Sequence, residues 1–320
     1  MLSLKAPLAC VWEITNKCNF SCPHCRAYME KPSENTEIEN KIINQLIKAE
    51  VLSVNISGGE PLLNPRLTQI VKKLTSDGID VGISTNGYIY RQKSLELLDA
   101  GISFVQISVD GPKVVHDQFR GVDGAYDNAL LAMKEAKKNG HFVQMNTTIT
   151  AFNIQYVFDN IKLAEDLGIN RIFFRRVVSA GLAGSNASVL PEKREYIELI
   201  KKLLQCKYSG HYNVNISIDD PIISVLDKER YDQTSICCSA GITSLGIDSC
   251  GNVFPCIFVR EKIGNLQSDD LQKIWTESEI LNKIRTRNIK KCGTCEYKWS
   301  CGGCRGAAGI GEWDYMCPLL

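Results

Sequence analysis

The chain has 320 residues, enough to bury a substantial core in one large domain or in a large and a small one. Its 37 lysines and arginines nearly balance its 36 aspartates and glutamates, so no net charge favours nucleic acid or an acidic membrane surface as a partner. The sequence shows neither a charged leader followed by an apolar run nor an apolar stretch of membrane-spanning length. We therefore expect a cytoplasmic protein with no nucleic-acid and no membrane partner.

Strand-like and helical stretches alternate from Leu8 to Val178. Apolar runs rich in β-branched residues predict strands, and apolar residues at helical spacing predict the helices between them. In chain order we expect a strand at Cys10–Ile14, a helix at Ile38–Ala49, a strand at Val51–Ile56, a helix at Arg66–Ser76, a strand at Asp80–Ser84, a helix at Gln92–Ala100, a strand at Phe104–Val109, a helix at Ala125–Asn139, a strand at Phe142–Ile149, a helix at Ile154–Leu167 and a strand at Arg171–Val178. This alternation, with nearly continuous apolar strands, indicates an α/β fold with a parallel sheet, either a barrel or an open doubly wound sheet.

The sequence changes character after this repeating section. Small residues at Ala180–Ser188 predict a flexible segment, and a helix is expected at Pro191–Cys206. Short elements follow Ser235, with a hairpin-like pair at Thr243–Ile247 and Val253–Pro255. We place the domains at residues 1–185 (barrel), 186–235 (bridging helix and linker) and 236–320, a small domain that would need metal to hold it together.

Fourteen cysteines are too many for ordinary packing. In a reducing compartment such a number indicates metal or cluster ligands before disulfides. Four cysteines lie between Cys10 and Cys25, nine lie between Cys237 and Cys317, and Cys206 stands alone between the two groups. We expect Cys10 and Cys206, which fit no ligand pattern, to be packed in the interior.

The first cysteine group, Cys18-x3-Cys22-x2-Cys25, offers three thiolates where a cubane iron–sulfur cluster has four irons, so one iron would stay open. This spacing resembles that of the radical S-adenosylmethionine (radical SAM) enzymes. The resemblance implies a partial (β/α)6 TIM-type barrel, and a [4Fe-4S] cluster whose open iron is chelated by S-adenosylmethionine and whose electron releases a 5′-deoxyadenosyl radical. A zinc site, with His24 as a fourth ligand, or a plain electron-transfer cluster are the alternatives.

Polar and glycine-rich residues follow the next three strands, at the rim where barrel enzymes build their sites. The resemblance implies that Gly58, Gly59 and Glu60, after the second strand, receive the methionine ammonium. Further cofactor contacts implied in the same way are Ser84 and Asn86 after the third strand and Ser108 and Asp110 after the fourth. Turn and capping roles remain the alternative for these residues, since Ser, Asn and Asp-Gly favour turns.

On the last two strands, Asn146 and one of Arg175 and Arg176 are expected to face the interior, where a cation would meet a substrate or cofactor carboxylate, or else to be solvated at a strand end. The three isolated histidines, His116, His141 and His211, are predicted to be structural or on the surface.

The second cysteine group resembles the SPASM extension of radical SAM enzymes, which carries auxiliary [4Fe-4S] clusters. The resemblance implies an outer cluster held by Cys292, Cys295, Cys301 and Cys317, and an inner cluster held by Cys238, Cys256 and Cys304. For the inner cluster the fourth position is left to Cys237, to Cys250 or to an open iron. A structural zinc ribbon is the alternative for the whole group.

The resemblance covers both ends of the chain but does not fix the reaction. We expect an enzyme that modifies a peptide or protein side chain by cross-linking, epimerisation or oxidation, with a small molecule such as a tetrapyrrole second and formylglycine formation in sulfatases third. The expected partners are the substrate, a reductant such as flavodoxin or ferredoxin, and a separate leader-peptide-binding protein, because almost no chain precedes the first strand. A noncatalytic iron–sulfur electron carrier is the alternative of another class, and no catalytic acid or base is identified.

Overall fold

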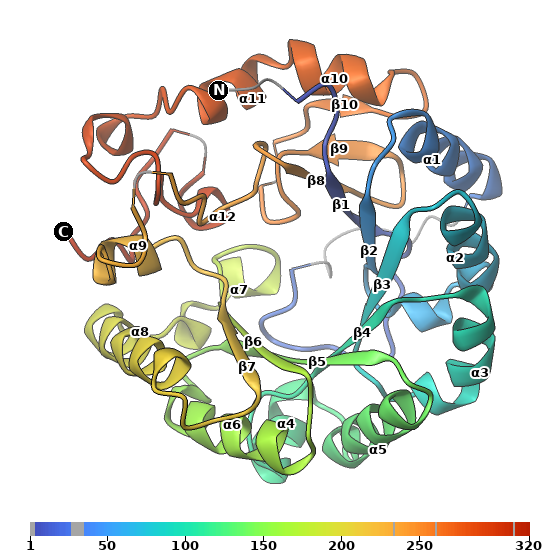
Figure 1. The fold of residues 1–320 in the computed structure, drawn as a ribbon, viewed down its shortest axis with the longest axis horizontal. Helices are drawn as coiled ribbons and strands as arrows, with labels where there is room; N and C mark the ends of the chain where they lie inside the picture. Colours follow the sequence, from blue (N-terminus) through green and yellow to red (C-terminus); the bar gives the residue numbers. More distant parts are fainter. Residues whose placement is uncertain (1–3, 27–34, 233, 260, 310) are drawn as a thin grey trace.

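The computed structural model describes residues 4–26, 35–232, 234–259, 261–309 and 311–320. Its centre is one strongly curved ten-stranded sheet, with helices α1 to α6 and α8 outside it (Figure 1). The strand order is β10-β9-β8-β1-β2-β3-β4-β5-β6-β7, so the curved sheet has two free edges and forms a partial barrel. The predicted fold class is confirmed.

The strands are β1 (Ala9–Glu13), β2 (Ser53–Ser57), β3 (Asp80–Thr85), β4 (Phe104–Ser108), β5 (Phe142–Ile149), β6 (Arg171–Arg176), β7 (Asn215–Ile218), β8 (Ser244–Ile247), β9 (Asn252–Phe254) and β10 (Gly264–Asn265). The helices are α1 (Thr36–Lys48), α2 (Leu67–Ser76), α3 (Tyr90–Ala100), α4 (Lys113–Arg120), α5 (Ala125–Lys138), α6 (Val157–Asp166), α7 (Leu182–Ser185), α8 (Lys193–Tyr208), α9 (Ile223–Leu226), α10 (Leu271–Glu277), α11 (Glu279–Arg285) and α12 (Arg305–Ala308). Short 3-10 turns lie at Pro61–Leu63, Ile154–Tyr156, Ala187–Val189 and Lys291–Thr294.

All six predicted strands and the helices between them are present, with ends that differ by a few residues. One element of this part of the chain, α4, was not predicted, and neither was β7 further along the chain. Both are short, eight and four residues, so their apolar pattern covers too few periods to stand out in the sequence.

The cysteine-rich region extends the barrel sheet. Strand β8 pairs in parallel with β1, with Ala9 opposite Ser244 and Trp12 opposite Ile247. Strands β9 and β10 continue as antiparallel neighbours, and β8–β9 is the predicted hairpin. Residues 236–320 therefore supply three strands of the barrel sheet, and the predicted domain bounds stay a prediction.

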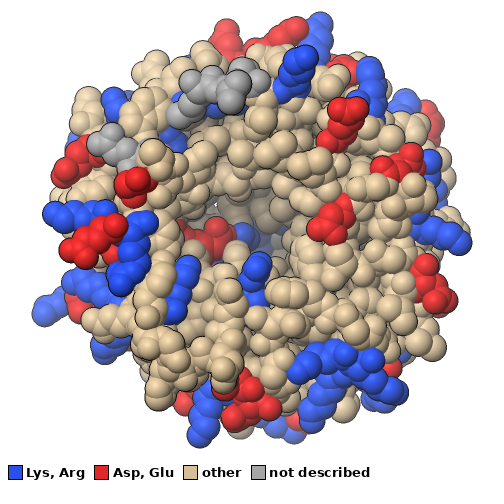
Figure 2. Space-filling model, in the orientation of Figure 1, with Lys and Arg blue, Asp and Glu red and all other residues tan. Residues whose placement is uncertain are grey.

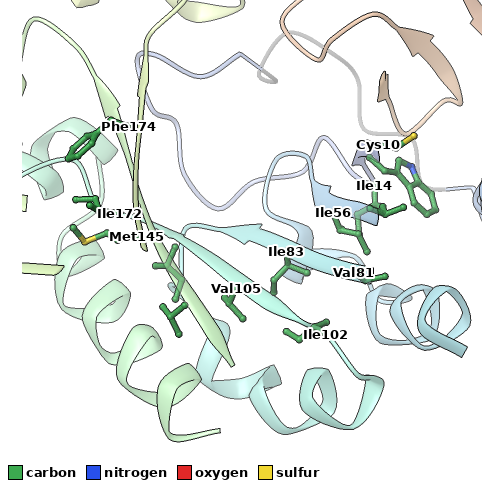
Figure 3. Close-up of a cluster of buried hydrophobic side chains, with 14 of the residues drawn as sticks. Cys10, Ile14, Ile56, Val81, Ile83, Ile102, Val105, Met145, Ile172 and Phe174 are labelled. Atoms are coloured by element: carbon green, nitrogen blue, oxygen red, sulfur yellow. The ribbon is translucent and has the colours of Figure 1, made fainter. Parts of the chain in front are cut away.

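The two faces of the sheet differ in chemistry. On β2, β4 and β6, buried and partly exposed residues alternate, because successive side chains point to opposite faces. The fully buried side chains, among them Ile56, Ile83, Val105, Met145 and Ile172, pack under the outer helices (Figure 3). These strands are not continuously apolar as expected, since their other face lines a polar cavity.

The segment predicted to be flexible, Ala180–Ser188, is folded and packed. It contains α7, and Ala183 is buried with Val177 and Val189 in a small apolar cluster. The backbone NH of Leu182 donates to the carbonyl of Cys25 at 2.8 Å, and a side chain at Gly181 would meet the carbonyl oxygens of Cys25 and Arg26 at 2.5 and 2.4 Å. Its small residues thus permit a close backbone approach.

In the described part of the chain, no helix is both long enough and apolar enough to cross a membrane.

Candidate active site and metal centres

A cavity of about 360 Å³ lies inside the curved sheet, where Figure 2 shows a hollow with basic and acidic side chains on its wall. Residues from β1 to β6 line it, together with Phe258 of the cysteine-rich region. Cys18, Cys22 and Cys25 all lie on its wall. The structure therefore brings the predicted triplet to the site that the strand-end loops build.

The cysteine loop rests on two glycines that follow β2. The NH of Gly59 donates to the carbonyl of Thr15 at 2.7 Å, and the NH of Glu60 donates to that of Lys17 at 2.8 Å. A Cβ at Gly58 would lie 2.3 Å from the Thr15 oxygen, and one at Gly59 would lie 2.2 Å from the Lys17 oxygen. Only glycine allows this backbone contact, which fixes the chain immediately before Cys18.

Glu60 is fully buried and lies behind the cavity wall. One carboxylate oxygen accepts from the Thr85 hydroxyl at 2.7 Å and from the Leu62 NH at 3.1 Å, and the other accepts from the Asn86 NH at 2.8 Å. Burial raises the pKa of Glu60 to about 7, against the lowering effect of these hydrogen bonds. The side chain ties the loop after β3 to the loop after β2, and its expected contact with a ligand ammonium stays a prediction.

Of the other predicted cofactor residues, Ser84, Asn86 and Ser108 line the cavity. The Asn86 amide donates to Asn19 at 2.8 Å and accepts from the NH of Tyr88 at 3.0 Å, so it connects the β3 loop to the cysteine loop. Ser84 shares a hydrogen bond of 3.0 Å with Asn55 of β2. Asn86 thus combines a turn role with a place on the wall.

Asp110 is fully buried, and its carboxylate faces Arg120 rather than the cavity. The Arg120 Nε donates to Asp110 at 2.7 Å, and the Thr148 NH donates to the other carboxylate oxygen at 3.0 Å. Burial, the largest single influence, would raise the pKa of Asp110, but the charge of Arg120, the two neighbouring histidines and the hydrogen bond from the Thr148 NH together lower it. Through this ion pair Asp110 positions Arg120, which lines the cavity.

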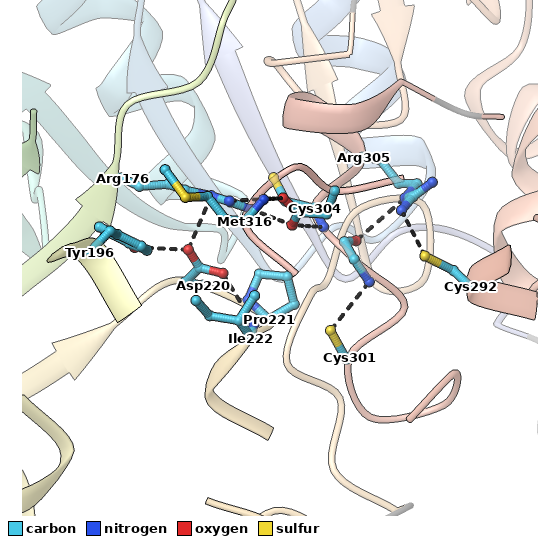
Figure 4. Close-up of polar contacts among 12 residues, drawn as sticks. Arg176, Tyr196, Asp220, Pro221, Ile222, Cys292, Cys301, Cys304, Arg305 and Met316 are labelled. Atoms are coloured by element: carbon cyan, nitrogen blue, oxygen red, sulfur yellow. Dashed lines mark hydrogen bonds and ion pairs between the residues drawn. The ribbon is translucent and has the colours of Figure 1, made fainter. Parts of the chain in front are cut away.

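The expectation for β5 and β6 is met, because Asn146, Arg175 and Arg176 all line the cavity. Arg176 is almost completely buried and pairs with Asp220 and Asp314 (Figure 4). Arg175 is more open, with its side chain 34% exposed, and Asp219 holds its Nε at 2.5 Å. Of these two arginines, Arg175 is thus the more accessible from the cavity.

Several wall residues were not predicted from the sequence: Arg26, Asn55, Phe104, Gln106, Arg120, Gln144, Phe173 and Phe258. For Asn55, Gln106 and Gln144, the available signal was a polar residue between two buried strand residues. Phe104 and Phe173 are apolar and lack this signal. For Arg120 it was an Arg closing a short amphipathic stretch after Asp110-Gly111. Phe258 and Arg26 carry no local signal.

The four cysteines predicted for the outer cluster line one small cavity. Cys292, Cys295, Cys301 and Cys317 come together there from three segments of the carboxyl-terminal region. Three of the sulfurs accept N–H groups. Cys292 accepts from Arg305 at 3.7 Å and Cys301 from the Gly303 NH at 3.4 Å (Figure 4), and Cys295 accepts from the Tyr297 NH at 3.4 Å. Donors aimed at sulfur suit thiolates held by iron.

The three cysteines predicted for the inner cluster also lie together. Burial, followed by the neighbouring Cys304 and Cys256, raises the pKa of Cys238. Cys237 faces another way, since its thiol hydrogen bonds with Ser224 and it packs against the main core. Cys250 lies in the turn between β8 and β9, where its carbonyl accepts from Asn265 and Gln267.

The donor sets fit iron–sulfur clusters. A backbone NH two residues further on donates to the sulfur of Cys18, Cys256, Cys295 and Cys301 at 3.4 to 3.5 Å. Within the described ranges no three His, Cys, Asp or Glu side chains converge on a point that would hold a single ion. A cubane does not require such convergence, because each thiolate binds a different iron.

Comparisons with known proteins agree with this arrangement. Residues 12–167 match the family model of the radical SAM superfamily, and residues 237–302 match that of the SPASM iron–sulfur cluster-binding domain. The chain belongs to the radical SAM enzymes with a carboxyl-terminal SPASM domain, as predicted.

The relatives of this chain carry names that point to different substrates. The chain is 30% identical to the AdoMet-dependent heme synthase of Methanosarcina barkeri, over 97% of this chain and 95% of that protein. It is 29% identical to the mycofactocin maturase MftC of Mycobacterium tuberculosis, over 95% of this chain and 80% of that one. Among solved structures, Streptococcus suis SuiB bound to S-adenosylmethionine superposes with a TM-score of 0.81 at 20% identity, over 99% of this chain and 78% of SuiB, which shows the shared fold.

Proposed function

We propose that Cys18, Cys22 and Cys25 hold a [4Fe-4S] cluster and that the cavity beside them binds S-adenosylmethionine. When bound together, cluster and S-adenosylmethionine supply a 5′-deoxyadenosyl radical that abstracts hydrogen from a substrate. The backbone of Gly58 and Gly59 and the side chains of Ser84, Asn86 and Ser108 are the groups that would orient the S-adenosylmethionine. A cytoplasmic reductant such as flavodoxin or ferredoxin would supply the electron.

The second part of the proposal is two auxiliary [4Fe-4S] clusters. Four cysteines of the outer set share one cavity, which supports a fully ligated cluster. Only three cysteines, Cys238, Cys256 and Cys304, form the inner set, while the side chain of Cys237 is engaged with Ser224. We therefore assign Cys237 no ligand role and propose an inner cluster with a position left for a group other than cysteine.

Iron content tests both parts. Reconstituted wild-type protein should contain about twelve irons per chain, for three four-iron clusters. Cys304→Ser should lose about four of them, whereas the matched variant Cys237→Ser should lose none. Stoichiometric zinc in place of iron in the carboxyl-terminal region, or equal iron loss in the two variants, would contradict the auxiliary-cluster assignment.

For the substrate we propose a tetrapyrrole with carboxylate side chains. Sequence motifs alone favour a peptide side chain, and the match to the heme synthase supports placing the tetrapyrrole first in this proposal. The heme synthase relative and this chain match over nearly their whole lengths, whereas the mycofactocin maturase extends beyond the matched part.

One observation in the cavity carries this substrate class: Arg175 stands between two aromatic rings. Its guanidinium carbon lies 5.5 Å from the ring centre of Phe173 and 5.0 Å from that of Phe258. The Asp219 carboxylate accepts from Nε of Arg175 and pairs with its Nη2. We therefore expect a ligand carboxylate to bind through the third nitrogen of Arg175, Nη1. Aromatic faces beside a fixed cation suit a flat, apolar ring system that carries acids at its edge.

The test measures binding of iron coproporphyrin III and the deoxyadenosine formed in its presence under anaerobic conditions. Arg175→Gln should weaken binding by about tenfold, the loss of one charge-assisted contact. Arg171→Gln is the matched control, because Arg171 lies on the same strand and covers Phe142 instead of the cavity. Esterified porphyrin should bind wild type and Arg175→Gln alike. Equal binding of the free acid to both arginine variants would contradict the role of Arg175.

A peptide side chain is the second candidate, supported by the 29% identity to the mycofactocin maturase. Its substrate would be a precursor peptide. Deoxyadenosine formation that rises with a peptide and not with any tetrapyrrole would favour it.

A further inference from the structure

We propose that Arg120, positioned by Asp110, sets the reduction potential of the cluster held by Cys18, Cys22 and Cys25. The inference rests on the proposed function, because it needs that cluster. It concerns a side chain to which neither the cysteine motif nor the cofactor contacts assign a role.

Arg120 is the last residue of α4, and it reaches Cys22 with both its backbone and its side chain. Its Nη1 lies 3.8 Å from the Cys22 sulfur, and its carbonyl oxygen lies 3.9 Å from the same atom. These are contacts between residues 98 positions apart in the sequence. Cys22 itself is buried in an apolar cluster with Phe20 and Ala125.

The ion pair with Asp110 keeps the guanidinium at this place. Nε donates to the carboxylate at 2.7 Å and Nη2 lies 2.5 Å from it, while the Asp110 NH donates to the His116 Nδ1 at 3.0 Å. Side-chain exposure is 9% for Arg120 and 0% for Asp110. Both charges therefore act through a poorly screening interior.

The other ionisable groups around Arg120 are Glu60 and the imidazoles of His24 and His116. Arg120 contacts the Cys22 sulfur through Nη1 and the Asp110 carboxylate through Nε, so this ion pair lies directly beside that cysteine.

A cluster gains negative charge when it accepts an electron, so a cation and an N–H donor at a ligating sulfur stabilise the reduced form. Arg120 supplies both at Cys22. Asp110, on the far side of the guanidinium, acts in the opposite sense. The two charges therefore make opposite contributions to the potential, which a purely structural pair would not do.

The test is a redox titration of reconstituted protein, followed by the electron paramagnetic resonance signal that changes when S-adenosylmethionine is added. Arg120→Gln should lower the midpoint potential, so that the ratio of reduced to oxidised cluster at a fixed potential falls by about tenfold, or about 59 mV for one electron. Asp110→Asn should shift the potential upward. Arg66→Gln, which disrupts the ion pair of Arg66 with Glu39, is the control and should leave it unchanged.

Iron content separates the outcomes. Loaded Arg120→Gln and Asp110→Asn proteins with unchanged potentials, or with shifts in the same direction, would overturn the proposal. If Arg120→Gln fails to load iron, the test rests on Asp110→Asn. An upward shift of its midpoint potential would support the proposal, and an unchanged potential would overturn it. Failure of both to load iron would show that the pair only assembles the site, and would also overturn it. A wild-type protein without any S-adenosylmethionine-sensitive signal would instead contradict the proposed function.

Discussion

At the scale of single residues, His116 shows how the interior changes a side chain's chemistry. It is 1% exposed, and its Nδ1 accepts the Asp110 NH at 3.0 Å. Burial, followed by the charge of Arg120, lowers its pKa from 6.5 to about 4. Between pH 6.5 and 4, the His116 ring is therefore neutral in the folded chain but protonated in the unfolded chain. Stability from this residue is therefore present above pH 6.5 and is lost as the pH falls toward 4.

The variant His116→Asn should reduce this acid sensitivity, because the Asn oxygen can accept the Asp110 NH in place of Nδ1 but does not titrate. Between pH 6.5 and 4 the wild-type free energy of unfolding should fall more steeply, by up to about 1.4 kcal/mol per pH unit for the one extra proton. Urea unfolding of the cluster-free protein at several pH values measures this. Parallel pH profiles for the two proteins would show that His116 does not titrate on unfolding.

Residue-level prediction worked where the chemistry is local. Cysteine is rare and its ligand spacing is short, so Cys18, Cys22 and Cys25 are found from the sequence alone. A motif does not say which way a side chain points: the structure shows the Glu60 carboxylate bonded to the Asn86 NH and that of Asp110 bonded to Arg120, and their cofactor contacts stay predictions. Phe258 reaches the cavity only through the tertiary fold, and no pattern around it indicates this.

At the scale of elements, the two glycines after β2 connect strand geometry to the cysteine loop. Gly59→Ala should displace the backbone at Lys17, because its Cβ would lie 2.2 Å from the Lys17 oxygen. We expect the variant to lose the first cluster, about four irons per chain, and to keep the auxiliary ones.

Gly184→Ala is the matched control for this change. A Cβ there meets its nearest neighbour at 3.6 Å, an ordinary contact. Iron analysis after reconstitution should show full loading for Gly184→Ala, and full loading of Gly59→Ala as well would contradict the steric argument.

Strong periodicity made the long elements predictable. Strand β5 has eight residues and was predicted with its observed bounds. Small-residue composition misled at Ala180–Ser188, because it is equally typical of flexible linkers and of chain that packs closely on other backbone. The close approach of Gly181 to the Cys25 and Arg26 carbonyls shows that this segment is closely packed chain and not a flexible linker.

At the scale of the whole molecule, the cysteine-rich region and the barrel share both a sheet and a buried ion-pair network. Arg176 of β6 pairs with Asp314, whose carboxylate also accepts the NH of Cys304 at 2.9 Å. Pairing of β8 with β1 was not predicted, since no local pattern in the sequence encodes which distant strands become neighbours.

A chain that ends at Ser235 should therefore fail as an independent barrel. It would leave β1 as an exposed edge and uncover apolar residues such as Trp12, which is fully buried in the complete chain. We expect the truncated chain to elute as an aggregate on size-exclusion chromatography under conditions in which the full-length, cluster-free protein, as the control, does not. A soluble, monomeric truncated chain would show that the predicted domain at 236–320 is separable.

The same pairing has a consequence for how the chain is made. Strand β1 is synthesised shortly before β2, which can cover one side of it early, but its other neighbour, β8, follows only after β2 to β7 have been made. Throughout that interval one edge of the strand that leads into the reactive cysteines is open to pairing with other chains. Productive folding thus depends on keeping nascent chains apart until β8 has paired with β1. The yield of folded protein should therefore respond to chaperones and to expression rate as much as to iron supply.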